Sequence, residues 1–226
     1  LESCQSAIFS IEEITTRPGK KSPAAPFTTS TLQQEAARKL GFTVAQTMMV
    51  AQRLYESGRI TYMRTDSVNL SELAINGSKE AITNMMGNKY VHPRHFSTKT
   101  KGAQEAHEAI RPTYMENAQI EGSAQEKKLY DLIWKRTIAS QMADAELEKT
   151  TATISISNTS EAFSATGEVV KFDGFLRVYR ESYDDDVEQE DETHLLPPLK
   201  KGQKLEYQNI TATERFTQHP PRYTEA

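Results

Sequence analysis

The sequence predicts an α+β protein in which a mostly helical part is inserted into a β domain formed by both ends of the chain. Between residues 25 and 148, apolar residues recur at helical spacing behind Ser and Thr residues that can cap helices. Both flanks, 1–24 and 149–226, instead contain runs that alternate between apolar and polar residues, as strands do. These ranges are the expected domains, joined by two chain crossings.

The first flank predicts one strand within residues 1–16, where Ile8, Phe9, Ile11 and Ile14 stand among polar residues. Arg17–Pro26 follows, with three prolines, one glycine and three basic residues. This composition is typical of an extended connector. A domain boundary is expected there.

Two consecutive helices are expected next. Ser30–Leu40 carries an apolar stripe and is stopped by Gly41, and Thr43–Ser57 begins with a capping-box pattern. With the β-prone residues Ile60–Tyr62 behind them, the two helices resemble a helix-turn-helix followed by the start of a wing. An ordinary helical hairpin whose apolar stripes form a core is the alternative.

The rest of the insert predicts a third helix that begins at Asn69 or Ser71 and ends at Gly87, and a loop over 88–101. A turn of helix is expected over Gln104–Ile110. It should end at Arg111, because the proline that follows pushes this residue out of helical geometry. Ser123 and Glu126 form a capping box for a long helix that reaches about Met142.

Strands are expected after the helical part. The runs 150–157, 163–172, 175–179 and 204–213 have strand patterns, and Asp173-Gly174 is a turn signal before the third. Between them, residues 183–192 carry seven carboxylates. Such a run can bind a metal, but it is more often a solvated connector, which we favour.

The composition restricts the class of protein. No run approaches the roughly 20 apolar residues of a membrane span, and one cysteine, Cys4, excludes an intrachain disulfide, so a reducing cytoplasm is expected. The net charge is −4, yet residues 22–148 hold 15 Lys and Arg against 14 Asp and Glu. Nucleic-acid contacts should therefore come from a local patch such as Arg53, Arg59 and Arg64.

Chemically versatile side chains gather between Gly58 and Leu70. Tyr62, Arg64, Thr65, Asp66 and Ser67 place a phenol, a guanidinium, a carboxylate and two hydroxyls within six residues. Tyr62 and Arg64 are two residues apart and would share one face of a strand. The segment is therefore a candidate site, although a half-buried strand that runs into a helix cap explains the same pattern.

Three blocks resemble the type IA DNA topoisomerases. Ile60–Ser67 is similar to their nucleophile segment, and Pro26–Gln34 and Gln104–Pro112 are similar to two further family blocks, in the same order. Met63 after the tyrosine is typical of the bacterial topoisomerase I branch. The resemblance implies a helical, winged-helix-like gate domain on a β arch.

The resemblance also implies a function. Tyr62 would be the nucleophile that cuts one strand of single-stranded DNA through a 5′-phosphotyrosine link, allows strand passage without ATP, and reseals to relax negative supercoils. Arg64 would assist it. The accessory or DNA-binding candidates are His107, Asp66, Thr65, Arg111 and Arg59, with helix capping by Asp66 and a salt bridge by Arg111 as alternatives.

Other regions of the family's enzymes are not recognised in this sequence. The resemblance implies a separate acidic N-terminal domain that binds Mg²⁺, and later C-terminal segments, so we expect an internal piece of a nucleoid-associated enzyme. No metal ligands are expected in the piece, which should be inactive by itself. The rival hypotheses are a non-enzymatic winged-helix DNA-binding module that reads bases with Gln46, Gln52 and Arg53, and a structural interaction domain.

Overall fold

The computed structural model describes residues 4, 6–97, 107–180, 196–214 and 216, and it has the expected α+β class, with helices and an antiparallel sheet. The chain divides into two compact units. Within the described ranges, one unit contains residues up to Lys20, Glu146–Phe172 and the residues from 196 on. The other contains Lys21–Ala145 and 173–180.

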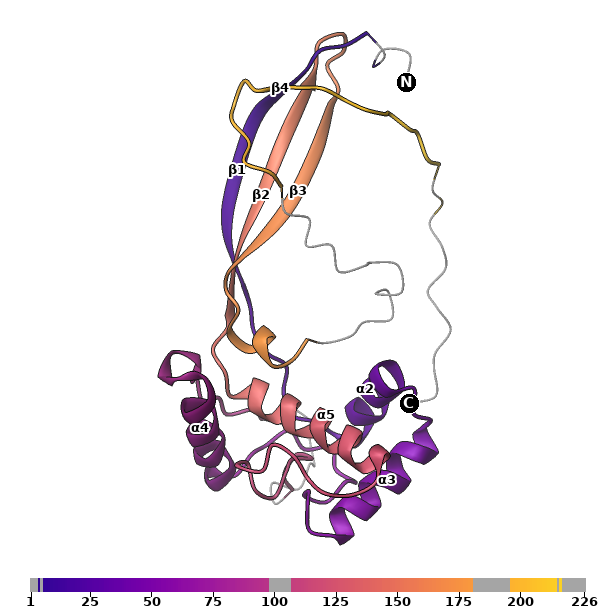
Figure 1. Cartoon of the computed structure of the whole chain (residues 1–226), viewed down its shortest axis with the longest axis vertical. Coiled ribbons are helices and arrows are strands. Elements are labelled where there is room, and N and C mark those ends of the chain that lie inside the picture. The colour runs from indigo at the N-terminus through magenta and orange to yellow at the C-terminus, as the bar shows by residue number, and fades with distance from the viewer. Residues whose placement is uncertain (1–3, 5, 98–106, 181–195, 215, 217–226) are drawn as a thin grey trace. The chain divides into compact units, whose positions relative to one another are not determined.

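The first unit is built on a sheet with the strand order β3-β2-β1-β4. Its strands are β1 (Phe9–Lys21), β2 (Ala145–Ile156), β3 (Ala162–Phe172) and β4 (Lys204–Leu205), and the three long ones run side by side (Figure 1). β2 and β3 form an antiparallel hairpin in which Ala152 lies opposite Ala165. Alternation of apolar and polar side chains therefore gave the right element type at both ends of the chain.

β1 continues to Lys21, through residues that the composition assigned to a connector. Among the described residues, β4 pairs only with Phe9 and Ser10 of β1. Most of β1 therefore has one side without a described strand beside it. A strand with such an edge tolerates Pro18, whose nitrogen has no proton to donate.

Three strand predictions were wrong in extent or type. β2 begins at Ala145, five residues before the expected start, and the described part of the last strand is only Lys204–Leu205. Residues 175–179 form no strand: η2 (Gly174–Arg177) is a 3₁₀ turn that starts from Gly174 with φ of 48°. Phe175 and Tyr179 are both buried, Arg177 between them is exposed, and the amide of Tyr179 donates to the carbonyl of Phe175 at 3.0 Å. This pattern is helical, because residues two apart would share one face of a strand.

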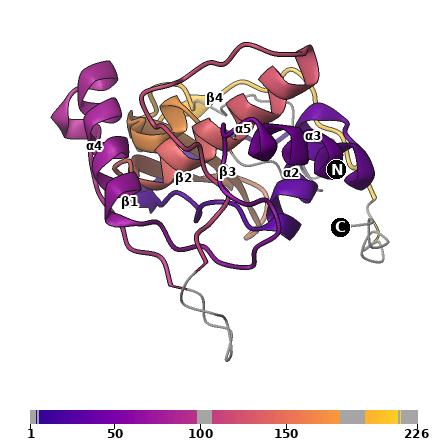
Figure 2. The same ribbon diagram turned by 90° about the horizontal axis from the view of Figure 1, so that it is seen from below.

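The second unit contains α2 (Thr29–Leu40), α3 (Val44–Glu56), α4 (Glu72–Met86), η1 (Asn88–Tyr90) and α5 (Ala124–Ser140). α5 contacts α2, α3 and α4, and it runs between α4 on one side and α2 and α3 on the other (Figures 1 and 2). The fully buried side chains of this core include those of Leu32, Leu54, Ile82, Leu129, Ile133 and Ile138.

Local capping signals predicted most helix ends. The side chains of Thr43, Ser71 and Ser123 cap α3, α4 and α5, and Gly41 ends α2 in the left-handed conformation with φ of 66°. The start of α2 differs slightly, because Thr28, not Ser30, is the N-cap and forms a capping box with Thr31. Thr28–Ser30 therefore form the N-terminal turn of this helix.

Two short segments differ from the structures expected for them, which were a β-strand at Ile60–Tyr62 and a turn of helix over Gln104–Ile110. Ile60 forms one isolated bridge with Pro112 and no strand follows it, while the described residues from His107 to Ile110 are extended, not helical. Both segments find their hydrogen-bond partners in other parts of the unit, which local propensity does not report. Residues 104–106 and the acidic run 183–192 lie outside the described residues.

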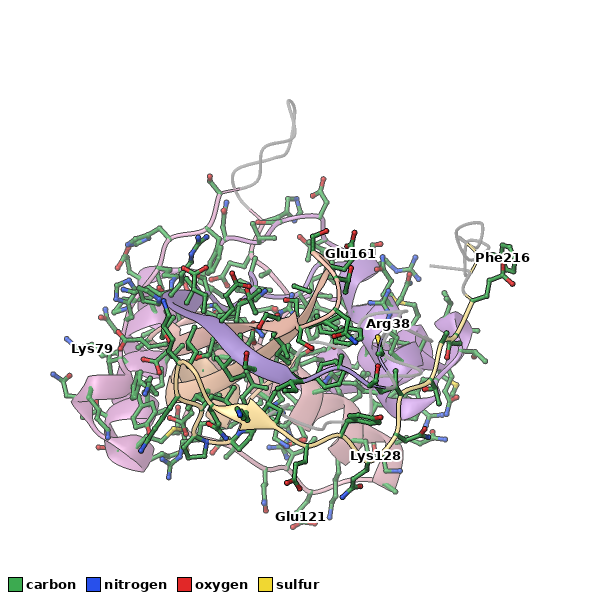
Figure 3. All side chains as sticks on the ribbon, turned by 90° about the horizontal axis from the view of Figure 1, so that it is seen from above. Arg38, Lys79, Glu121, Lys128, Glu161 and Phe216 are labelled. Atoms are coloured by element: carbon green, nitrogen blue, oxygen red, sulfur yellow. The ribbon has the colours of Figure 1, made fainter. Side chains whose placement is uncertain are left out.

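The charged surface residues follow the usual pattern of a helical domain. Lys79, Glu121 and Lys128 lie exposed at its periphery (Figure 3). Among the residues that the structure describes, no helix is long and apolar enough to cross a membrane.

A buried polar cluster attaches residues 173–180 to the helices. The hydroxyl of Tyr179 donates a hydrogen bond of 2.5 Å to Oε2 of Glu35, which is only 5% exposed and lies on α2. The guanidinium of Arg136 on α5 lies 5.3 Å from the centre of the Tyr179 ring and 5.0 Å from that of Phe27. Burial and the bond to Glu35 raise the pKa of Tyr179 far above its ordinary value.

We expect Tyr179→Phe to lower the free energy of unfolding of the helical unit by about 1.5–3 kcal/mol, because Glu35 loses a charge-assisted hydrogen bond in a buried place. Trp134, the single tryptophan, lies buried on α5 and reports this unit in urea unfolding followed by fluorescence. Tyr114→Phe, at an exposed position, is the matched control. Equal unfolding midpoints for the two variants would contradict the role of the cluster.

Candidate active site

Two chain segments far apart in the sequence are joined through Thr61. Its amide donates to the carbonyl of Arg111 at 2.9 Å, and its hydroxyl donates to the carbonyl of Ala109 at 2.7 Å. The same hydroxyl oxygen accepts the amide of Arg111 at 2.9 Å. The backbone just before Tyr62 is therefore fixed from both sides by residues 109–111.

Thr29, in the first turn of α2, fixes the backbone after Tyr62. Its hydroxyl donates to the carbonyls of Met63 and Thr65, at 2.9 and 3.1 Å, and accepts the amide of Thr65 at 2.9 Å. Its own amide donates to the carbonyl of Thr65 at 2.9 Å. Residues 63–65 are thus attached to the N-terminus of a helix, although they form no regular strand.

The side chains of this segment alternate in exposure. Met63 and Ser67 are 2% exposed, whereas Tyr62 is 44% exposed and Arg64 and Asp66 also point to solvent. Both Tyr62 and Arg64 are exposed, as the predicted shared face requires, although the segment is not a strand. A phenol and a guanidinium two residues apart are accessible on one rigid stretch of backbone.

A pocket of about 440 Å³ lies next to this stretch. It is lined by residues from three segments: Thr28, Thr29, Ser30, Arg64, Thr65, Asp66 and His107. The first turn of α2 contains no acidic side chain, and a helix N-terminus carries a partial positive charge. Together with Arg64, it makes one wall of the pocket suited to an anion such as a phosphate, with Asp66 as the opposing charge.

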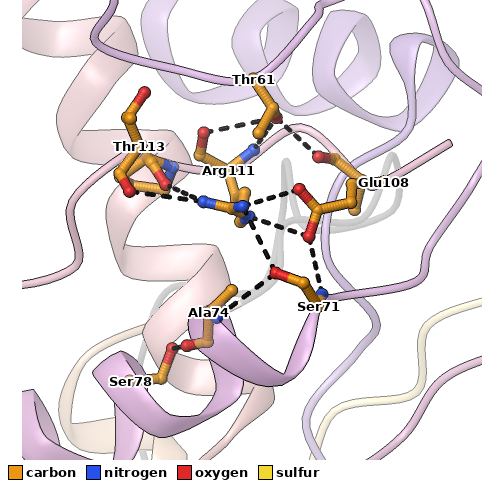
Figure 4. A network of polar contacts seen from close by, with 9 residues as sticks. Thr61, Ser71, Ala74, Ser78, Glu108, Arg111 and Thr113 are labelled. Atoms are coloured by element: carbon orange, nitrogen blue, oxygen red, sulfur yellow. Dashed lines mark hydrogen bonds and ion pairs between the residues drawn. The ribbon is translucent and has the colours of Figure 1, made fainter.

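Arg111 lies beneath this surface in a polar network (Figure 4). The guanidinium is 8% exposed, donates to Oε2 of Glu108 at 2.6 Å, and also donates to the carbonyl of Pro112 at 2.9 Å. Glu108 in turn accepts the amide of Ser71, the N-cap of α4, at 2.7 Å. The network connects the start of α4 to residues 108–113.

The carboxylate of Glu108 is held in its charged form. Burial by itself raises its pKa, but hydrogen bonds from Arg111 and Ser71 outweigh that effect and bring the pKa below its ordinary value. A charged Glu108 in turn balances the buried guanidinium of Arg111. Loss of Glu108 would therefore leave the guanidinium of Arg111 buried without its opposite charge.

The structure thus brings together four of the predicted site residues, Arg64, Thr65, Asp66 and His107, in one pocket. Tyr62 is not among the residues that line it. Arg111 pairs with Glu108 beneath the surface. The hydrogen bonds described for Arg59 are made by its backbone: its carbonyl accepts the amide of Thr113, and its amide donates to the carbonyl of Leu54.

Sequence reasoning missed several residues at the site. Thr28, Thr29 and Ser30 were noticed as helix-cap candidates and as part of the block Pro26–Gln34, but not as site residues, although three successive hydroxyl residues at a helix start are a signal for an anion-binding turn. Glu108 lies in the block Gln104–Pro112 but was not singled out as a site residue, and Tyr55 was not singled out either. Tyr55 contacts the ring of Tyr62 edge to face, with ring centres 5.3 Å apart.

Within the described ranges, no three His, Cys, Asp or Glu side chains come close enough together to hold a metal ion. The pocket itself offers one carboxylate, from Asp66, and one imidazole, from His107. These residues do not fit the oxygen-rich shell that Mg²⁺ requires.

Comparison with known proteins identifies the class to which this fold and site belong. A profile of the DNA topoisomerase family matches residues 1–226. DNA topoisomerase 1 of Zymomonas mobilis is 47% identical over 227 residues, which cover 98% of this chain and 19% of that protein. DNA topoisomerase 1 of a Synechocystis strain is 46% identical over 226 residues, which cover 97% of this chain and 25% of that protein.

A solved structure supports the same assignment. Full-length topoisomerase I from Thermotoga maritima superposes with a TM-score of 0.73 at 36% identity, over 90% of this chain and 33% of that one. The chain belongs to the bacterial type IA DNA topoisomerase family, as its three sequence blocks indicated. It spans between a fifth and a third of the length of these three relatives.

We expect Thr29→Val to speed hydrogen exchange of the Thr65 amide by about ten- to a hundredfold. Valine keeps the shape of threonine but leaves this amide and the Met63 carbonyl without their partner, which costs about 1–3 kcal/mol locally. Thr29→Ser keeps the hydroxyl and is the control. Unchanged exchange in the valine variant would show that Thr29 does not hold the segment.

We expect Glu108→Gln to lower the free energy of unfolding at pH 7 by about 1 kcal/mol, a value reduced for the partial exposure of Glu108. Because the folded pKa of Glu108 is lowered, its stabilising effect is present above its unfolded pKa and is lost as the pH falls through the folded pKa. The difference between parent and variant should therefore vanish in acid. Urea unfolding followed by Trp134 fluorescence between neutral and acid pH measures it, and a constant difference would contradict it.

Proposed function

We propose that this chain is the part of a type IA DNA topoisomerase that carries the nucleophile, Tyr62. The observation that carries the proposal is the pocket that joins Arg64 and His107 to the first turn of α2, beside an exposed Tyr62 on a fixed backbone. A nucleophile needs such access and such rigidity. Family membership and the match of Ile60–Ser67 to the nucleophile segment support the same residue.

In the proposed reaction, the phenolic oxygen of Tyr62 attacks the phosphorus of a DNA phosphodiester. The new oxygen–phosphorus bond forms as the bond to the 3′ oxygen breaks, the phenol loses its proton, and the 3′ oxygen gains one. One phosphate ester replaces another, so the step is reversible without ATP, and resealing is its reverse. The broken strand keeps its 5′ phosphate on the tyrosine while another strand passes.

The reaction has an electrostatic cost that the pocket can offset. A phenol in water has a pKa near 10, so ionising it at pH 7 costs about 4 kcal/mol. A charge-assisted hydrogen bond from Arg64 to the phosphate or the phenolate contributes about 1.5–3 kcal/mol. The amide-rich first turn of α2 supplies further positive potential for the non-bridging phosphate oxygens.

We assign the remaining candidates by their surroundings. His107, Thr65 and Asp66 line the pocket and would contact the bound strand, with Asp66 placed to orient Arg64. Arg111 would act indirectly, by holding residues 107–113 through Glu108. Arg59 would contact DNA outside the pocket. Phosphate contacts of this kind weaken as the salt concentration rises.

The activity as a whole belongs, in this proposal, to a longer polypeptide. The relatives extend well beyond the matched region, so we propose that an N-terminal acidic domain binds Mg²⁺ and that C-terminal segments complete the enzyme. The helical unit would be a winged-helix-like gate on the β arch. The substrate would be single-stranded DNA in the bacterial nucleoid. The chain by itself would not cleave DNA.

Family membership does not favour the rival hypothesis of a non-enzymatic DNA-binding module.

We expect Tyr62→Phe in the longer enzyme to abolish the covalent DNA adduct while leaving folding almost unchanged, since only an exposed hydroxyl is removed. Arg64→Lys keeps the charge but loses the planar fork. It should lower the cleavage rate by one to two powers of ten, or about 1.4–2.8 kcal/mol of transition-state stabilisation. Single-turnover cleavage of a labelled oligonucleotide, with trapping by denaturant, measures both effects.

The matched control is Tyr114→Phe, which removes a more exposed phenol that lies outside the pocket. It should cleave at the parent rate. A denaturation-resistant adduct in Tyr62→Phe would show that another residue is the nucleophile. Normal function of Tyr62→Phe without any adduct in the parent would favour a binding module.

A further inference from the structure

The side chain of Tyr55 makes the one aromatic contact described for Tyr62. The two ring centres are 5.3 Å apart with an angle of 67° between the ring planes, which is an edge-to-face arrangement. Tyr55 is 42% exposed and Tyr62 is 44% exposed, so the contact lies at the surface and leaves part of both rings accessible. None of the roles argued above uses Tyr55.

The backbone contacts of the site do not orient the ring of Tyr62. They fix Thr61 on one side and Met63 and Thr65 on the other, but an exposed tyrosine on a fixed backbone still has three staggered rotamers about its first side-chain bond. Each rotamer places the hydroxyl oxygen in a different position. The local backbone dihedrals and the neighbouring side chains together decide which rotamer is favoured, and Tyr55 is such a neighbour.

Tyr55 is itself well supported. It lies in the last turn of α3, where its carbonyl accepts the amide of Gly58 at 2.8 Å. The neighbouring Leu54 is 1% exposed, and its carbonyl accepts the amide of Arg59 at 2.8 Å. The end of the helix is therefore anchored in the core, and the ring of Tyr55 projects from a fixed position.

We propose that Tyr55 is a positioning residue: its ring holds the phenol of Tyr62 in one rotamer, so that the hydroxyl oxygen is already directed for attack when DNA binds. This inference rests on the proposed role of Tyr62 as the nucleophile. The contact orients the phenol before the bond to phosphorus forms, and the same orientation serves resealing, which is the reverse step. Without it, the nucleophile spends part of its time in rotamers that cannot react, which lowers the rate but not the affinity for DNA.

The first experiment tests the contact in the 226-residue chain, without any assumption about catalysis. Fluorotyrosine is incorporated in place of all nine tyrosines, and the fluorine NMR signal of Tyr62 is identified by its loss in Tyr62→Phe. In the parent, the ring of Tyr55 should displace this signal. In Tyr55→Leu, which keeps an apolar side chain of good helix propensity, the signal should move to the position of an exposed fluorotyrosine.

The second experiment tests the consequence in the longer enzyme that contains this region. Tyr55→Leu should lower the single-turnover cleavage rate by about two- to tenfold, the range expected for one aromatic pair, with unchanged affinity for a single-stranded oligonucleotide. Tyr55→Phe keeps the ring and should restore the rate. Tyr114→Leu, at an exposed position outside the pocket, controls for the loss of a surface phenol.

The outcomes separate this inference from the function on which it rests. An unmoved Tyr62 signal in Tyr55→Leu, or a normal cleavage rate in that variant, overturns the positioning role. Weaker DNA binding with a normal rate would instead make Tyr55 a surface on which bases stack, and overturns it too. A persistent adduct in Tyr62→Phe overturns the proposed nucleophile, whereas the NMR result for the ring contact would stand.

Discussion

Hydrogen bonds between sequence-distant segments at the N-terminus of α2 are the constraint on which the site depends. Phe27 accepts the amide of Ile110 through its carbonyl, and Thr29 binds the backbone of residues 63–65. Neither Pro26–Thr28 nor the chain around Tyr62 is a regular element, so each would leave backbone groups without partners if it stood alone. Pairing with residues 109–111 and with the first turn of α2 gives the backbone of these irregular segments fixed partners.

These hydrogen bonds explain how side chains can be exposed to solvent while the backbone that carries them is fixed. Buried Met63 and Ser67 anchor the segment, while Tyr62 and Arg64 face outward between them. The N-terminal turn of α2 contributes its amide dipoles to the pocket and, through Thr29, a mechanical attachment for the same segment. Any displacement of this helix would therefore move both one wall of the pocket and the backbone of residues 63–65 together.

Charges in this unit serve two distinct purposes. Arg64, Asp66 and His107 line an open pocket, where their charges are available to a ligand. Glu35 and Arg111, in contrast, are buried. Glu35 joins α2 to residues 173–180 through Tyr179, and Arg111, through Glu108, joins residues 108–113 to the start of α4. An arginine that suggests nucleic-acid binding in a sequence can therefore have a structural role instead. Burial distinguishes the two roles: exposed Arg64 is available to a ligand, whereas buried Arg111 holds its own segment in place.

The sequence by itself determined the fold class, the helices and the residues to examine, because capping boxes, apolar stripes and strand alternation act over a few residues. It also singled out Arg64, Thr65, Asp66 and His107 through motif blocks. Only the tertiary structure decided that Ile60–Tyr62 is not a strand, that 175–179 is a turn, and that Thr28–Ser30 complete the pocket. Those outcomes depend on hydrogen bonds and ring contacts between residues from about 35 to more than 140 positions apart, which local patterns do not encode.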